Sequence, residues 1–276
     1  MRALPLRPVA IHAVLIGYTL LAFMPTALVV MNAFKTRAGI FGAPLAFPGP
    51  ATFSLAGFSG VLARSHFPLY FVNSMIVTGA SLLLVLLLGA MAAWVLSEYQ
   101  FRGNRVLALY LSFGIMIPIR LGSVSILHIM VALGLVNTLA ALVLVYVAQG
   151  LPLCIFILSE FMAQIPSGLK DAARVDGSGE AWIFFRLVLP LLRPVVATVA
   201  IFTAIPVWND LWFPLILAPG EATRTITLGV QSFIGQYVTD WNSVLASLSL
   251  AIIPVVLFYL LLSRQLIRGL TSGAIK

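Results

Sequence analysis

The chain has 276 residues, of which 61% are hydrophobic and only 9% charged, and its mean hydropathy is +1.09. Soluble domains carry about 25% charged residues, so this composition excludes an ordinary soluble protein and indicates an integral membrane protein. The formal net charge of +8 could indicate a nucleic-acid surface, but the basic residues form no dense run, and we expect no nucleic-acid partner.

Six stretches are long and apolar enough to cross a bilayer, because about 20 helical residues span a hydrocarbon core about 30 Å thick. We therefore predict an all-α integral membrane protein with a single transmembrane domain over residues 1–276 and no soluble domain. The third and fourth stretches are separated by Gly134 to Thr138, a segment that favours a turn. The expected spans are residues 9–31, 71–96, 106–126, 138–158, 191–213 and 244–262.

The distribution of Lys and Arg predicts the orientation of these spans. If both termini are cytoplasmic, eleven of the 16 basic residues lie on the inner side and five on the outer side, as the positive-inside rule favours. The first stretch is longer than a signal-peptide core, and we expect it to be an uncleaved anchor.

Motifs for chemistry are absent from the sequence. It contains no GxxxxGK[ST], GxSxG or HExxH pattern, so we expect neither an ATPase site nor an enzyme active site in this chain. The lone Cys154 falls inside the fourth span, and His12 and His66 show no metal-ligand pairing, so we expect no metal site.

A polar segment, residues 163–190, interrupts the apolar sequence between the fourth and fifth spans. We expect two short helices here, the first with Ser167 as its N-cap and Gly177 in the left-handed conformation at its end, the second capped by Ser178. One interpretation is an amphipathic loop on the membrane surface. The other is a docking element, because Ala172 and Ala173 would let another backbone approach closely.

A resemblance favours the docking interpretation. The run Asp171-Ala172-Ala173, followed by Asp176-Gly177 and, twelve residues later, by Pro190, resembles the EAA loop of bacterial ABC importer permeases. It departs from the family pattern in having Asp171 where the family has Glu. Further landmarks point to the carbohydrate-uptake branch and its MalG-like subunits: Phe34-Lys35-Thr36, Asn73-Ser74, Phe101-Arg102-Gly103, Met116-Ile117-Pro118, Trp208-Asn209-Asp210 and the C-terminal run Arg268 to Ala274.

The resemblance implies a MetI-like permease fold in the bacterial inner membrane and a set of partners. These are a second, MalF-like permease, two cytoplasmic ATPase subunits that use ATP and Mg, and an extracytoplasmic solute-binding protein. The chain itself would bind no cofactor. The residues implied to couple it to the ATPase are Asp171, Ala172, Ala173, Asp176 and Gly177.

Polar groups within the spans are candidates for the substrate pathway. Arg120 could be a snorkelling arginine, or it could face an outer vestibule and bind the acid group of an acidic sugar. Trp208 and Trp212 flank Asn209 and Asp210; their indole rings could form an interfacial belt or stack on sugar faces. Three further polar groups are expected to form hydrogen bonds between helices: Asn73, His128 and Gln149.

Rival functions remain at this point. One alternative is an ABC permease for a non-sugar solute. An ion-coupled secondary transporter would need coupling acids at the midplane, and the first, second, fourth and sixth expected spans contain no acidic residue. A membrane enzyme would need a nucleophile or metal constellation that the sequence does not show.

Overall fold

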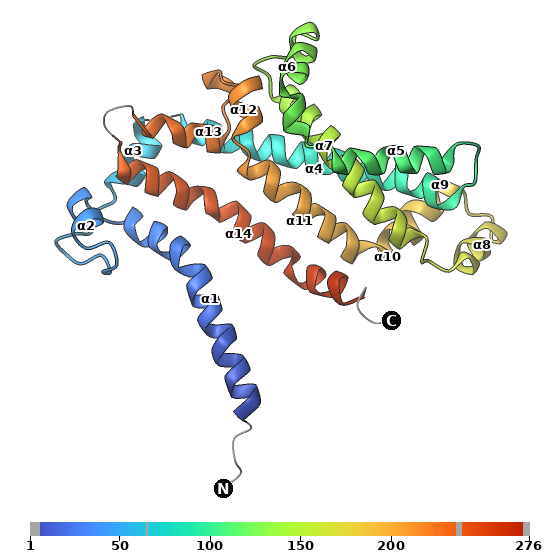
Figure 1. The fold of residues 1–276 in the computed structure, drawn as a ribbon, viewed down its shortest axis with the longest axis horizontal. Coiled ribbons are helices and arrows are strands. Elements are labelled where there is room, and N and C mark those ends of the chain that lie inside the picture. Colours follow the sequence, from blue (N-terminus) through green and yellow to red (C-terminus); the bar gives the residue numbers. More distant parts are fainter. Residues whose placement is uncertain (1–5, 65, 236–238, 273–276) are drawn as a thin grey trace. The chain divides into compact units, whose positions relative to one another are not determined.

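The computed structural model describes residues 6–64, 66–235 and 239–272 (Figure 1). Its regular structure there is helical, apart from two isolated bridges that join Lys35 to Phe53 and Ile234 to Thr239, so the predicted all-α class is confirmed. The longer helices are α1 (Leu6–Ala33), α3 (Ala56–Arg64), α4 (Phe67–Glu98), α5 (Asn104–Met116), α6 (Ser123–Ala132), α7 (Leu139–Met162), α8 (Ser167–Val175), α11 (Arg193–Asn209) and α14 (Trp241–Ser272). The short ones are α2 (Arg37–Gly42), η1 (Ile119–Gly122), α9 (Glu180–Trp182), η2 (Ile183–Val188), α10 (Leu189–Leu191), α12 (Trp212–Leu217), η3 (Glu221–Thr223), α13 (Ile226–Val230) and η4 (Gln231–Phe233).

Four described helices are individually long and apolar enough to cross a membrane: α1, α4, α7 and α14. Two further candidates are bent pairs of helices. The segment 104–116 meets 119–132 at 86°, and the segment 180–191 meets 193–209 at 78°. The described part of the chain therefore offers six spans when each bent pair is counted as one.

The third expected span, 106–126, is not one continuous helix. Helix α5 ends at Met116, and Ile117 is extended, with φ −86° and ψ 117°. The reason is Pro118, because a proline disfavours helical backbone at the residue before it. The break expected around Gly134 is confirmed: Gly134 and Asn137 have positive φ values of 66° and 60°, which glycine and asparagine tolerate.

The fifth expected span, 191–213, is also shorter than predicted. Helix α11 begins at Arg193 and ends at Asn209, and Asp210 is extended at φ −72° and ψ 134°. The Asp210 carboxylate accepts the backbone N–H groups of Trp212 and Phe213 at 3.4 and 3.1 Å. An aspartate that bonds the following backbone in this way competes with helical hydrogen bonding, so α12 starts as a separate helix.

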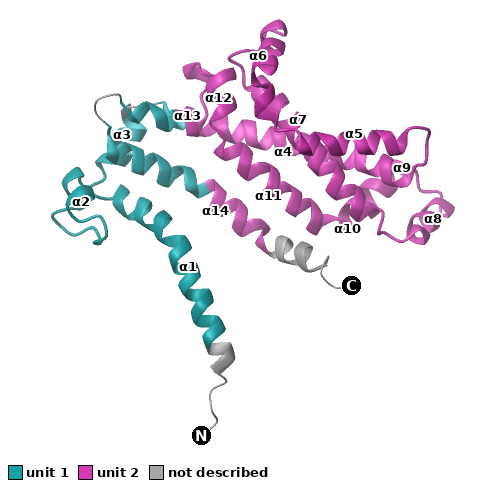
Figure 2. Cartoon of the chain, in the orientation of Figure 1, with its two compact units in different colours: residues 1–68, 229–253 teal, residues 69–228, 254–276 magenta. Residues whose placement is uncertain are grey.

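Two compact units make up the chain (Figure 2). The first comprises residues 1–68 and 229–253 and contains a buried lysine. The Lys35 ammonium donates to Asn32 Oδ1 and to the carbonyl oxygens of Ala43 and Pro44 at 2.9, 2.9 and 3.3 Å. These three acceptors satisfy the three ammonium donors, which holds the loop after α2 against the end of α1.

The second unit comprises residues 69–228 and 254–276, and small residues let its helices pack closely. A Cβ added to Gly89 of α4 would lie 2.4 Å from Cys154 Sγ of α7, and one added to Gly150 would lie 2.8 Å from Val85. Close contact through small residues is a common way for membrane helices to associate. The core beside these contacts extends from α4 to the helix that follows the polar segment.

Some sequence landmarks lie at the limits of the described residues. Arg2 and Lys276, counted in the predicted orientation, are outside them, as are Gly273 and Ala274 of the C-terminal landmark.

Candidate functional site

The polar segment forms α8, a turn at Gly177, and a second helical stretch that begins at Glu180. Gly177 has φ +81°, as predicted for the residue that ends the first helix. The predicted caps were wrong: Ser167 is the first residue of α8, after Pro166, and the second stretch begins after Gly179, with no side-chain cap hydrogen bond at either start. The Pro166 and Gly179 backbones precede the two helices with ψ 127° and 156°.

Helix α8 exposes apolar side chains and turns much of its charge inward. Val175 is 87% exposed and Leu169 is 50% exposed, and Ala172 is also exposed. Ala173 is half-buried and packs against the core of the second unit, so the expected bare pair of alanines is reduced to Ala172. This leaves a small apolar strip on an otherwise polar helix.

The inward charges of α8 bind the end of α4. Glu98, the last residue of α4, accepts hydrogen bonds from Lys170 and from Arg174, the latter with Nη2 2.6 Å from Oε1. The Lys170 ammonium also lies 5.6 Å from the ring centroid of Trp94, close enough for a cation–π contact. Side-chain exposure is only 10% for Glu98 and 9% for Lys170.

Arg174 extends this set of ion pairs to both sides of the turn. Its Nη1 lies 2.9 Å from Asp171 Oδ1 and its Nε lies 2.7 Å from Glu180 Oε1. Tyr99, just beyond α4, donates its hydroxyl to Glu180 Oε2 at 2.8 Å. One guanidinium therefore joins three carboxylates from three segments, a role suited to its planar fork of donors.

This network shifts the protonation equilibria of its members. The hydrogen bond from Arg174, and then the one from Tyr99, lower the pKa of Glu180. Desolvation, followed by the bond to Glu180, raises the pKa of Tyr99. The bonds to Glu180 and Glu98 raise the pKa of Arg174. Glu180 and Arg174 therefore stay charged together over a wider pH range than isolated side chains.

A second cluster forms where two helices break. Arg120, in η1, places Nη2 3.0 Å from Oδ1 of Asp210, which follows α11. The Asp210 side chain is 7% exposed, whereas that of Arg120 is 66% exposed. The structure thus brings together two residues that sequence analysis treated separately, ninety positions apart.

Asp210 is the hub of this cluster. Its Oδ2 accepts from the Tyr146 hydroxyl at 2.9 Å and from the Phe213 N–H at 3.1 Å, and its backbone carbonyl accepts from Thr227 at 2.6 Å. Trp212 adds a bond from its indole nitrogen to Ser123 Oγ at 2.8 Å. These bonds tie η1, α6, α7 and α12 together.

The three remaining candidate residues differ in exposure. Trp212 is 43% exposed, and Asn209 is exposed with its amide bonded to the Ile205 carbonyl at 3.0 Å. Trp208 is only 5% exposed and meets Phe71 edge-on, with ring centroids 5.8 Å apart. Of the two indoles, only that of Trp212 therefore offers much surface to a ligand.

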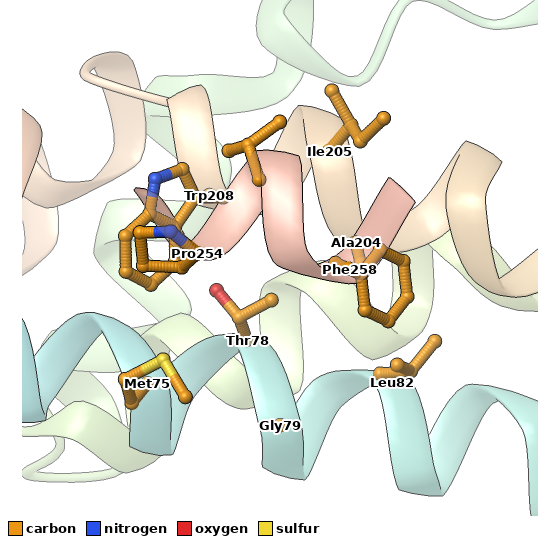
Figure 3. Close-up of a pocket in the computed structure, with 10 residues that line it drawn as sticks. Met75, Thr78, Gly79, Leu82, Ala204, Ile205, Trp208, Pro254 and Phe258 are labelled. Atoms are coloured by element: carbon orange, nitrogen blue, oxygen red, sulfur yellow. The ribbon is translucent and has the colours of Figure 1, made fainter. Parts of the chain in front are cut away.

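Trp208 lines a cavity of about 250 Å³ between α4, α11 and α14 (Figure 3). Its walls are apolar apart from the Thr78 hydroxyl and the indole nitrogen of Trp208. The lining residues are Met75, Thr78, Gly79, Leu82, Ala204, Ile205, Trp208, Pro254, Val255 and Phe258.

Asn73 joins distant segments as expected, with partners in and just after the short helix η3. Its amide donates to the carbonyl oxygens of Ala222 and Arg224, both at 2.9 Å, and the neighbouring Ser74 accepts the Ile226 N–H at 2.8 Å. Among the residues that the structure describes, no group of three or more His, Cys, Asp or Glu side chains could hold a metal ion.

Sequence analysis missed Glu98, Tyr99 and Tyr146 as members of these clusters. The sequence carried one signal for Glu98. It is an acid directly after a long apolar stretch, and that stretch was expected to end on the same side of the membrane as the basic residues of the polar segment. Tyr146 carried none, because one tyrosine in an apolar helix is equally consistent with ordinary packing.

The long apolar helices and the bent pairs, together with a charged helix outside them, indicate a multi-pass membrane protein. The family comparison names this class: residues 85–272 match the model of the binding-protein-dependent transport system inner membrane component. The chain belongs to this family. It is a transport subunit of the inner membrane rather than an enzyme, and it works with a solute-binding protein and an ATPase.

Individual relatives agree over nearly the whole chain. It is 31% identical to the diacetylchitobiose uptake system permease protein NgcG of Streptomyces coelicolor, covering 96% of this chain and 88% of the relative. It is 34% identical to the melibiose/raffinose/stachyose import permease protein MelC of Bacillus subtilis, covering 92% and 91%. The structure of a bacterial ABC transporter involved in the import of the acidic polysaccharide alginate matches with a TM-score of 0.79 at 20% identity, over 96% and 98% of the two chains, which supports the permease fold.

Proposed function

We propose that this chain is one permease subunit of an ABC importer that carries a carbohydrate into the cell. The relatives named above import oligosaccharides, and they align over more than nine-tenths of this chain. The proposed complex contains a second, MalF-like permease, two cytoplasmic ATPase subunits and an extracytoplasmic solute-binding protein. ATP and Mg belong to the ATPase subunits, and both termini of this chain are cytoplasmic.

Helix α8 is the proposed point at which ATP hydrolysis drives the permease. The single observation that carries this proposal is the exposed apolar strip of Leu169, Ala172 and Val175 on a helix fixed by ion pairs. In this proposal α8 lies on the water side of the membrane, where a contiguous apolar strip is suited to contact with a partner protein. In this proposal Asp171, Ala173, Asp176 and Gly177 shape the docking helix, and rigid-body motion of the docked helix opens the pathway.

The cluster at Arg120 suits an acidic sugar. Only Nη2 of its guanidinium is held by Asp210, and the side chain is 66% exposed, so the other N–H groups can bind a carboxylate. Trp212 supplies an exposed ring for stacking on a sugar face, and Asn209 supplies an exposed amide. Trp208 shapes the wall of the cavity instead.

Transport by the reconstituted complex tests the proposal. Vesicles containing both permeases and the ATPase, supplied with the solute-binding protein, are tested for uptake of labelled diacetylchitobiose, raffinose and an alginate oligosaccharide. We expect uptake of at least one probe only with ATP and the ATPase present. Uptake by this chain alone under an ion gradient, or ATP-dependent uptake of non-sugar solutes only, would contradict it.

The acidic-sugar proposal has its own test in the same vesicles. Arg120→Gln is expected to lower alginate-oligosaccharide uptake by about 10-fold or more, the scale of one lost charged hydrogen bond, while Arg120→Lys retains part of it. Arg37→Gln, which removes an exposed charge from α2, is the matched control. Equal uptake by Arg120→Gln and the wild type would refute a role for Arg120 in binding an acid group.

A further inference from the structure

The attachment of α8 to the rest of the second unit depends on few covalent constraints. The chain enters α8 through the short turn after Met162, and it leaves through Gly177, whose positive φ marks a tight reversal. Two short turns at its ends fix the position of a nine-residue helix only loosely. The ion pairs with α4, together with the packing of Ala173 against the core, supply the remaining restraint.

Those ion pairs converge on Glu98. Each of its two oxygens pairs with one cation of α8: Oε2 with Lys170 and Oε1 with Arg174. Both partners project from successive turns of α8, so the carboxylate opposes sliding as well as rotation of the helix. With a side-chain exposure of 10%, the pairing is shielded from the solvent that weakens surface ion pairs.

On the other side of these ion pairs lies the long helix α4. Glu98 is the last residue of α4, a helix of 32 residues that lines the cavity beside Trp208. A displacement of α8 is therefore passed through the carboxylate to α4, the helix that also lines this cavity.

We propose that Glu98 is a positioning residue for energy coupling: it locks the docking helix to α4, so that events at the ATPase and along α4 are mechanically linked. The same geometry assigns Asp171 an internal role. Its Oδ1 is 2.9 Å from Arg174 Nη1, so it orients that guanidinium, although the Asp171 side chain is itself 61% exposed. This inference rests on the proposed docking function of α8.

The test is the stimulation of ATP hydrolysis by the solute-binding protein in the complete, reconstituted importer. That stimulation requires communication from the outer side of the permease to the ATPase. We expect Glu98→Gln to reduce the fold-stimulation at least about 5-fold, the lower range of typical coupling between sites, while the ATPase still co-purifies. Glu98→Asp, which keeps the charge, should restore part of the stimulation.

Glu160→Gln is the matched control, because Glu160 is an exposed acid near the end of α7 and should leave the stimulation unchanged. If the Glu98→Gln complex cannot be assembled, Lys170→Met removes one arm of the contact and should give an intermediate loss. Wild-type stimulation in Glu98→Gln, or in Lys170→Met where that variant is used, would overturn the inference.

A separate variant distinguishes failure of this inference from failure of the docking proposal. Val175→Asp places a charge on the exposed strip without touching the ion pairs, and it should prevent co-purification of the ATPase. If the ATPase still binds normally, α8 is not the docking helix and the proposed function of this segment fails. If Val175→Asp blocks binding but Glu98→Gln couples normally, only the positioning role is wrong.

Discussion

Replacing Asp210 by alanine should destabilise the protein more than replacing either of its side-chain partners. Asp210 is 8% exposed and accepts hydrogen bonds from the Tyr146 hydroxyl and the Phe213 N–H on one oxygen, and from Arg120 on the other. Removing the carboxylate leaves the tyrosine hydroxyl and one buried N–H without an acceptor. Arg120 can instead turn to water, because its side chain is already 66% exposed.

The magnitudes follow from this difference in burial. A buried donor that loses its acceptor costs about 1–3 kcal/mol, so Asp210→Ala should cost about 2–6 kcal/mol from its two buried donors. Tyr146→Phe removes one hydroxyl and leaves the carboxylate its other donors, which should cost about 1–2 kcal/mol. Arg120→Gln breaks an ion pair that is exposed on one side, which should cost about 1 kcal/mol or less.

The assay is thermal unfolding of the purified complex in lipid nanodiscs, followed by intrinsic fluorescence. The melting temperature should fall most for Asp210→Ala, less for Tyr146→Phe and least for Arg120→Gln. Asp240→Asn is the control, because the Asp240 carboxylate accepts the Ser243 N–H at the start of α14 and an asparagine oxygen can accept it in the same way. If Arg120→Gln lowered the melting temperature as much as Asp210→Ala, the ion pair would be the main stabilising interaction and the reasoning from buried donors would be refuted.

Four further predictions concern packing, the cavity, the first unit and pH. Gly89→Ala should lower the free energy of unfolding by about 1–3 kcal/mol, because the added methyl overlaps the Cys154 sulfur. Gly79→Ala, with nothing within 4 Å of its Cβ, should lower it much less, and the melting temperatures of the two variants test this difference. Trp208→Ala should lower stability by about 3–5 kcal/mol because it enlarges a cavity already of about 250 Å³, and detergent-induced unfolding that matched the wild type would contradict this. Lys35→Met should cost about 1–3 kcal/mol by leaving buried acceptors unpaired, measured as faster proteolysis of residues 36–55. The pKa of Glu180 is lowered in the folded state, so its stabilisation of the loop is complete above an unfolded pKa of about 4.3 and is lost as the pH falls through the lower folded value. Pepsin cleavage of α8 should therefore rise as the pH falls across that range. The Glu180→Gln variant should be cleaved readily throughout.

Apolar length and turn-forming residues made the helical segments predictable, whereas pairing between distant segments was not predictable. The turn at Gly134 and the left-handed Gly177 follow from local backbone preferences, and both are confirmed. The break at Pro118 could also have been predicted, because a proline disfavours helix at the residue before it. In the prediction, the continuous run of apolar residues outweighed that rule. A hydrophobic stretch indicates a segment that lies in lipid, but it does not show whether the helix bends within that segment.

The two clusters of polar residues lay beyond sequence reasoning for a different reason. Arg120 and Asp210 are ninety positions apart, and Glu98 lies more than seventy positions before its cationic partners. Each residue alone was consistent with an interfacial or solvated side chain. Only the packing of α4 against the polar segment, and of η1 against the break after α11, makes their charges meet.

The state of Asp210 also bears on how transport is driven. An ion-coupled transporter needs a carboxylate that can take up and release a cation at membrane depth, and Asp210 is the acid inside the expected fifth span. Its carboxylate already accepts from Arg120, Tyr146, Phe213 and Trp212. A coupling cation would have to displace the guanidinium and leave buried donors without acceptors. Asp210 therefore holds two broken helices together, and the energy for transport is expected to enter instead through α8, the proposed docking helix, which ion pairs hold in place.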